Sequence, residues 1–158
     1  MDGPRLLADE MVGRLARYLR FQGCDTEYVR GASDDEVLRR AAEEGRVIVT
    51  RDRALARRAP RALLLSSGSL RDQWIAVARA FPEIPRTVAM TRCTLCNGPL
   101  VPDVGAPPSG GAPDAAGPLA PRGGPTVRCA RCGHRYWEGS HTARVRQRLA
   151  AWSAEIGP

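Results

Sequence analysis

The chain has 158 residues, 43% of them hydrophobic, and a formal net charge of +7. This length allows one compact domain plus a small attachment, and the hydrophobic content excludes a globally disordered chain. All 24 basic residues are arginine, and the positive excess indicates a polyanionic partner, nucleic acid before membrane. No apolar run reaches the roughly 18 residues that a membrane helix needs, and the first residues lack a secretory signal pattern. We therefore expect a cytoplasmic protein without a membrane partner, in which paired cysteines bind metal.

The first half of the chain predicts strands that alternate with helices. Short apolar or β-branched runs predict strands over residues 5–8, 25–29, 46–50 and 62–65. Amphipathic periodicity predicts helices over residues 10–22, 34–44, 53–58 and 70–81, and Ser33 and Glu36 have capping-box spacing before the second. This alternation indicates an α/β fold with a parallel sheet covered by helices on both faces.

Acidic residues follow the predicted strands. Right-handed crossovers bring the carboxyl ends of parallel strands to one edge, which receives Asp9, Thr50 to Asp52, and the loop with Asp34 and Asp35. Each acid alone could be a helix cap. Three acids at one edge would repel one another unless a cation lay among them, and oxygen ligands favour Mg²⁺ or Mn²⁺. This edge is therefore our candidate catalytic metal site.

Other catalytic candidates are weaker. Glu10 and Asp72 could add a ligand, although the Glu10 side chain should point away from that of Asp9. The sequence has no P-loop, no G-x-G-x-x-G after a strand and no G-x-S-x-G elbow. Neither histidine has an evident route to Cys24, which we expect to be an inert core cysteine.

Two CxxC pairs, Cys93 with Cys96 and Cys129 with Cys132, form the most specific motif. Two such knuckles complete a tetrahedral zinc site whose four thiolates leave no open position, so we expect a structural zinc ribbon. Two redox dithiols or a pair of disulfides are the alternative. The spacer exceeds the usual 15–20 residues because it contains residues 102–125, where Gly or Pro fills 13 of 24 positions. That insert should be flexible.

These patterns divide the chain into three parts. Residues 1–88 form the predicted α/β domain, residues 89–140 the zinc ribbon with its insert, and residues 141–158 a terminal helix. The helix has an apolar face of Val145, Leu149, Trp152 and Ile156. We expect the ribbon and this helix to dock on the α/β domain.

Several motifs together point to a family. They are residues 7–11 with 13–20 and Gly23, Ser33–Asp34, Thr50–Arg51–Asp52, both cysteine pairs and residues 136–141. In these motifs the chain resembles a PIN-like ribonuclease family named for the C-terminal domain of the exonuclease Mut-seven. The resemblance implies a PIN-like three-layer α/β/α domain, a C-terminal zinc ribbon, and RNA cleavage that uses acidic residues with Mg²⁺ or Mn²⁺. By position the implied acids are Asp9, Asp34 and Asp52, with Asp35 the alternative to Asp34.

We therefore expect a metal-dependent ribonuclease that hydrolyses RNA phosphodiester bonds. Asp9, Asp34 and Asp52 would hold the metal, and Thr50 or Arg51 would orient the phosphate. The expected RNA-binding residues are basic or aromatic: Arg14, Arg17, Arg51, Tyr136, Trp137 and His141. The aromatic residues could instead pack over the ribbon and enlarge its small core.

Two other functions fit the same patterns. In the first, the chain is a non-catalytic RNA- or ribosome-binding zinc-ribbon protein with a degenerate PIN-like domain, whose acids act only as helix caps. Its partner would be the ribosome or an RNA-processing complex. In the second, weaker one, the chain is the toxin of a toxin–antitoxin pair.

Overall fold

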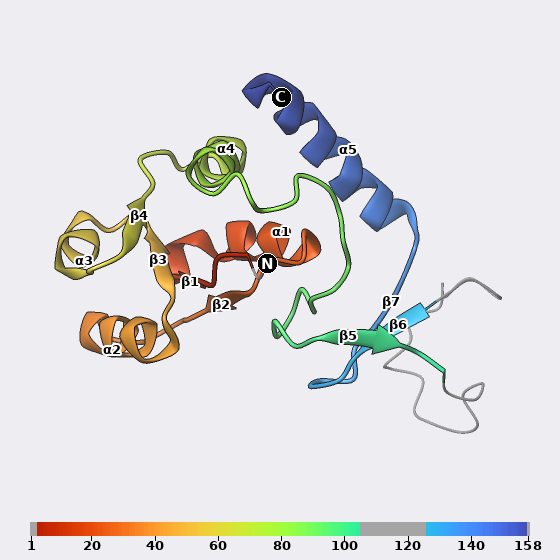
Figure 1. Ribbon diagram of the computed structural model, residues 1–158, viewed down its shortest axis with the longest axis horizontal. Coiled ribbons are helices and arrows are strands. Elements are labelled where there is room, and N and C mark those ends of the chain that lie inside the picture. Colours follow the sequence, from red (N-terminus) through yellow and green to blue (C-terminus); the bar gives the residue numbers. More distant parts are fainter. Residues whose placement is uncertain (1–2, 105–125, 158) are drawn as a thin grey trace.

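The computed structural model describes residues 3–104 and 126–157 (Figure 1). Most of the predicted flexible insert, residues 105–125, therefore lies outside the described residues. None of the described helices is long and apolar enough to cross a membrane.

A parallel sheet of four strands forms the centre of the α/β part. The strands are β1 (Leu6–Ala8), β2 (Thr26–Tyr28), β3 (Val47–Thr50) and β4 (Ala62–Leu64), in the spatial order β2-β1-β3-β4. The connections are the 3₁₀ helix η1 (Glu10–Val12) and the helices α1 (Gly13–Phe21), α2 (Asp34–Glu44), α3 (Arg53–Arg58) and α4 (Leu70–Ala80). The predicted alternation of parallel strands and helices is confirmed.

Helices cover both faces of this sheet (Figure 1). Alternate residues of a strand point to opposite faces, and the core accordingly has two parts. Leu6 and Val49 pack with residues of α1 and α4, whereas Leu7 and Ile48 pack with residues of α2 and α3. The central strands β1 and β3 are therefore buried on both faces, which explains why their sequences are apolar without alternation.

The helix predicted over residues 10–22 begins differently from the expectation. Its first turn is the 3₁₀ helix η1, and the α-helical conformation starts only at Gly13. At this point the chain passes against the ring of Tyr28, where a Cβ atom on residue 13 would lie 2.9 Å from Cζ. The absence of a side chain at Gly13 lets α1 pack closely on β2.

The C-terminal helix α5 (Ser140–Ile156) returns to the same core. Val145 and Leu149 are buried with the residues of α1 and α4. The Trp152 ring lies 5.4 Å from that of Tyr18 and 5.6 Å from that of Trp74. The ribbon is thus inserted in the chain between α4 and α5, two helices that pack against each other.

Three short antiparallel strands build the ribbon part. They are β5 (Leu100–Pro102), β6 (Thr126–Cys129) and β7 (Arg135–Trp137), in the order β5-β6-β7. The first cysteine pair precedes β5, and the second begins at the last residue of β6. Such a sheet can bury few apolar side chains, so its stability has to come from the metal site and from docking.

The first cysteine loop docks on the edge strand β2. The buried side chain of Asn97 accepts a hydrogen bond from the Thr26 N–H (3.1 Å) and donates to Asp25 Oδ1 (2.7 Å). Buried Arg20 donates to the Thr26 carbonyl (2.7 Å) and to the carbonyls of Thr94 (3.1 Å) and Leu95. These bonds tie the loop that carries Cys93 and Cys96 to the sheet.

Charge supports the same contact. Burial alone would raise the pKa of Asp25, but hydrogen bonds from Arg46 and Asn97 outweigh it, and the pKa falls to about 2. Asp25 therefore stays ionised at neutral pH and holds both partners.

Replacing Asn97 with alanine should lower the free energy of unfolding by about 2–3 kcal/mol, because it leaves the buried Thr26 N–H without an acceptor. Alanine must also adopt the positive φ of 65° found at this position. Asn97→Gly loses the same hydrogen bonds but adopts this φ freely. Comparing the two variants in urea denaturation therefore separates the cost of the lost hydrogen bonds from the cost of the strained backbone. Losses below about 0.5 kcal/mol in both variants would show that this contact is not needed for stability.

Candidate active site and zinc centre

Three predicted acids meet in one pocket at the carboxyl edge of the parallel sheet. Asp9 follows β1, Asp52 follows β3, and Asp34 is the first residue of α2. All three line a small pocket of about 100 Å³. In the order β2-β1-β3-β4, the chain places β2 on one side of β1 and β3 on the other. Open α/β sheets bind ligands at such a switch point, and the pocket lies beside it.

A chain of hydrogen bonds connects the ends of β1 and β3. The Thr50 hydroxyl, which is fully buried, donates to Asp9 Oδ2 (2.5 Å) and accepts from the Asp52 N–H (2.9 Å). Because the backbone N–H occupies an acceptor position, the hydroxyl proton is directed at Asp9. Thr50 therefore positions the Asp9 carboxylate.

Two of the acids also cap helices. Asp9 Oδ1 accepts from the Met11 N–H (3.3 Å) at the start of η1. Asp52 Oδ1 accepts from the N–H groups of Ala54 (2.7 Å) and Leu55 (3.1 Å) at the start of α3. Both bonds to Asp52 end on Oδ1, which leaves Oδ2 for another ligand.

The Asp34–Asp35 doublet is divided by the structure. Ser33, rather than either aspartate, caps α2 by accepting from the Glu36 N–H (3.3 Å), as the capping-box spacing predicts. Asp34 is half-buried and lines the pocket, while the Asp35 side chain is 83% exposed and does not. Arg58 forms ion pairs with both, at 3.7 Å from Asp34.

A fourth acid lines the pocket, and it is Glu10. Its carboxylate accepts a hydrogen bond from the Gly31 N–H (3.1 Å). The strand alternation predicted that the Glu10 side chain points away from that of Asp9. The chain instead enters a 3₁₀ turn at Glu10, so the alternation stops there and Glu10 reaches the same pocket. Asp72, the other candidate, instead accepts from Ser67 (3.0 Å) and pairs with Arg71.

The donor atoms of the pocket are more widely spaced than those of a fully closed metal site. Within the described residues, the four paired cysteines are the only group of three or more His, Cys, Asp or Glu whose ligand atoms all lie within 4.8 Å of one another. Mg²⁺ usually keeps several waters and binds one or two carboxylates directly. An ion bound in this way would not require the pocket acids to lie in contact with one another.

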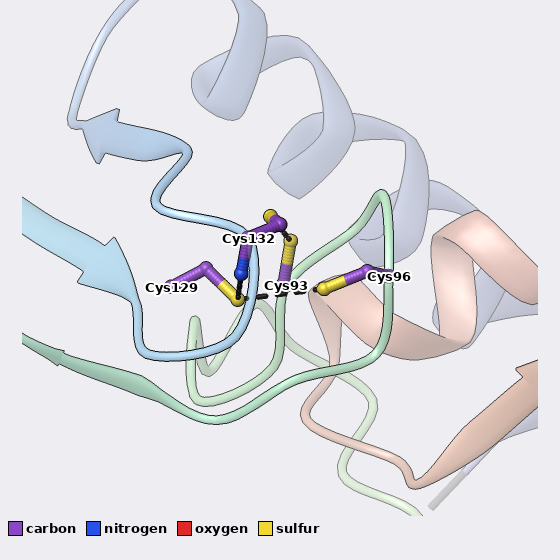
Figure 2. A group of neighbouring side chains, drawn as sticks. All are labelled: Cys93, Cys96, Cys129 and Cys132. Atoms are coloured by element: carbon purple, nitrogen blue, oxygen red, sulfur yellow. Dashed lines mark hydrogen bonds between the residues drawn. The ribbon is translucent and has the colours of Figure 1, made fainter.

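The two CxxC pairs come together, as predicted. Figure 2 shows the four side chains converging from two loops. The Sγ atoms of Cys93 and Cys132 are 3.7 Å apart, and those of Cys96 and Cys129 are 3.4 Å apart. Tetrahedral zinc with Zn–S bonds near 2.3 Å would place its sulfurs about 3.8 Å apart, whereas a disulfide needs about 2.05 Å. The cluster fits a zinc site.

The loop of the second pair, Cys129 to Cys132, favours a thiolate. Burial raises the pKa of the Cys129 thiol, but hydrogen bonds from the backbone N–H groups of Cys132 and Arg131 outweigh it and bring the pKa to about 7. These bonds are 3.4 and 3.3 Å long. They favour the charged form that a metal requires.

Tyr136 is part of the metal site's surroundings. Its hydroxyl lies 3.0 Å from Cys93 Sγ and accepts from the Thr94 N–H (3.1 Å). Burial raises the pKa of Tyr136 to about 12, so the hydroxyl keeps its proton and can donate to the sulfur. The ring thereby supports the ribbon, the packing alternative considered above for the aromatic residues.

The other predicted RNA contacts lie on two surfaces. Arg14 and Arg17 are exposed on α1, and Trp137 and His141 lie where β7 leads into α5. Arg51 is half-buried, and its Nε atom has no hydrogen-bond partner. Its guanidinium packs near Gly68, where a Cβ atom would lie 3.6 Å away.

Comparison with known proteins identifies the family. The sequence matches the Mut7-C RNAse domain over residues 4–149, nearly the whole chain. No curated protein and no solved structure matches it. The matched region includes the acidic pocket and all four clustered cysteines. The chain therefore belongs to the Mut7-C RNAse domain family, as the resemblance predicted.

Proposed function

We propose that the chain is a metal-dependent ribonuclease built on a PIN-like three-layer α/β/α domain. The observation that carries the proposal is the acidic pocket, in which carboxylates from three strand-to-helix junctions meet. The pocket lies at the carboxyl edge of a parallel sheet, the usual ligand site of open α/β folds. Membership of an RNAse-domain family supports the same chemistry.

The pocket residues would hold Mg²⁺ or Mn²⁺. Asp9, Asp34 and Asp52 supply the hard oxygen ligands that these ions prefer. When bound, such an ion would activate water and offset the negative charge that develops on the phosphate. Thr50 fixes the orientation of the Asp9 carboxylate, and Asp52 presents its free Oδ2 atom.

The zinc ribbon has a structural role in this proposal and extends the RNA-binding surface. The exposed residues Arg14 and Arg17 on α1 contact backbone phosphates, and Arg51, the neighbour of Asp52 in the chain, orients the phosphate. Phosphate contacts of this kind position a nucleic acid without reading its sequence.

The doublet at the start of α2 supplies a matched test. Purified zinc-loaded protein is incubated with single-stranded and structured RNA, with Mn²⁺ or in buffer without Mg²⁺ or Mn²⁺, and initial rates are compared for wild type, Asp34→Asn and Asp35→Asn. We expect cleavage to require the metal and to fall by at least about 100-fold in Asp34→Asn, since even outer-shell partners of a metal contribute 10–100-fold. Asp35→Asn also loses a contact with Arg58 but lies outside the pocket, so its rate should stay within about threefold. Equal rates with and without Mn²⁺, or equal losses in both variants, contradict the proposed site.

A second function is favoured by one observation. Asp9 and Asp52 do cap helices, and caps alone would suit a non-catalytic RNA- or ribosome-binding protein. That function predicts RNA binding without cleavage under every metal condition, so the same incubation distinguishes the two.

A further inference from the structure

A second hollow, which we call the base pocket, lies between the ribbon, α1 and α5. It has a volume of about 360 Å³, within the usual range of small-ligand sites. Most of its side chains are aromatic or basic, among them Arg17, Phe21, His134, Tyr136, Trp137 and His141. The acidic site does not account for this concentration of rings.

Four of the five rings that line the base pocket are arranged in two pairs. His134 and Tyr136 meet edge to face with centroids 4.9 Å apart, and Phe21 and His141 lie 5.8 Å apart. His134 and His141 are exposed and Trp137 is half-buried, so the ring surfaces are accessible. Aromatic surfaces of this kind bind unpaired bases by stacking, with little sequence preference.

Shared residues link the base pocket to the acidic pocket. Between them lies a groove of about 510 Å³, which shares Arg17 and Thr94 with the base pocket and Glu10 and Met11 with the acidic pocket. Arg14 also lines the groove and, three residues before Arg17, lies on the same side of α1. The path follows α1, whose nine residues span about 13 Å.

Charge changes along this path. The acidic end suits a metal ion and a phosphate, the arginines of the groove suit the phosphates of a backbone, and the aromatic end suits a base. Arg135 in the base pocket is paired with Asp103 at 2.8 Å. Arg20 also lines the groove but is buried and donates to backbone carbonyls, so Arg14 and Arg17 are its exposed arginines. This order matches the parts of one extended nucleic-acid strand.

We infer that the base pocket binds an unpaired base of single-stranded RNA, whose backbone runs along Arg17 and Arg14 to the acidic pocket. The inference rests on the proposed ribonuclease function for the position of the cleaved phosphate. A base of an intact duplex is stacked and paired and cannot enter the base pocket. The ribbon and α5 thereby select single strands and fix how many nucleotides separate the bound base from the cleaved bond.

Binding without cleavage tests this inference. Full-length protein carrying Asp34→Asn, with zinc bound and in EDTA-free buffer without Mg²⁺ or Mn²⁺, is titrated against a fluorescent 12-nucleotide single-stranded RNA and against the same sequence as a duplex. Fluorescence anisotropy gives both affinities. His141→Ala and Trp137→Ala should each weaken single-strand binding by about 10-fold and duplex binding by less than twofold. Trp137→Phe, which keeps a ring, should restore most of the single-strand affinity.

Controls separate stacking from charge and from folding. Arg17→Ala should weaken binding of both RNAs, whereas Arg79→Ala, another exposed helical arginine that lines none of these pockets, should change neither. The zinc content of Trp137→Ala must equal that of the parent, and His141 lies on α5 outside the ribbon strands, so its variant does not depend on ribbon folding. Equal losses for both RNAs in the two alanine variants, or none, would overturn the inference.

The result is independent of catalysis. If no variant or metal gives cleavage but single-strand binding depends on His141 and Trp137, the base pocket stands and the ribonuclease proposal fails. If cleavage depends on Asp34 but neither ring affects binding, the ribonuclease proposal stands and the base pocket fails.

Discussion

Replacing Cys129 with serine is expected to release the zinc and to lower the stability of the protein by several kcal/mol. The Cys129 sulfur accepts two backbone N–H groups and faces Cys96 at 3.4 Å. Structural zinc contributes about 10–16 kcal/mol to the folding of zinc-finger peptides, and this ribbon has only three short strands. The loss should extend to the α/β part, because Asn97 and Arg20 join the first cysteine loop to β2.

Metal content and urea denaturation together check this expectation. Wild type should contain one zinc per chain, and treatment with a strong chelator should reproduce the destabilisation seen in Cys129→Ser. The control is Cys24→Ala, which removes a buried cysteine outside the ribbon and should leave the zinc content unchanged. A Cys129→Ser protein with full zinc content, or with wild-type stability, would rule out a structural zinc at this position.

Replacing Asp9 with asparagine is expected to reduce cleavage by at least about 100-fold while the protein stays folded. Asparagine has the same shape but lacks the negative charge that a hard cation requires. It has a single oxygen acceptor, so it can keep the bond from Thr50 or the one from the Met11 N–H, but not both. The stability cost should therefore be only about 1 kcal/mol.

Initial rates at saturating Mn²⁺ and circular dichroism separate these two effects. Asp72→Asn serves as the control, because Asp72 is also an aspartate in the first turn of a helix but lies outside the acidic pocket. Its rate should remain within about twofold of wild type. An Asp9→Asn protein that retained more than a fifth of the wild-type rate would exclude Asp9 as a metal ligand.

The features that follow local rules could be predicted from the sequence. Buried apolar runs with helical segments between them give the parallel sheet, and the sheet in turn brings Asp9, Asp34 and Asp52 to one edge. The spacing of the cysteines gives the metal cluster. Each of these predictions depends on periodicity or on a handedness rule that holds for most proteins.

Tertiary contacts could not be predicted in this way. Glu10 enters the acidic pocket because a 3₁₀ turn interrupts the strand pattern, and the close packing of Gly13 on Tyr28 follows directly after that turn. Nothing in the spacing indicates that Arg58 faces Asp34 or that the Tyr136 hydroxyl reaches Cys93. These contacts join residues far apart in the chain, and no local pattern encodes them.

The contact between the first cysteine loop and β2 also bears on aggregation. An edge strand presents unpaired backbone groups to which a strand of another chain can add. Here Asn97 and Arg20 occupy the N–H and the carbonyl of Thr26, the first residue of that edge strand. Loss of zinc would release Asn97 with its loop and expose the Thr26 N–H, whereas Arg20 lies on α1 and would keep its bond to the carbonyl. Zinc-depleted protein should therefore self-associate through β2. The metal cluster thus protects the edge of the sheet from association, in addition to holding its own two loops together.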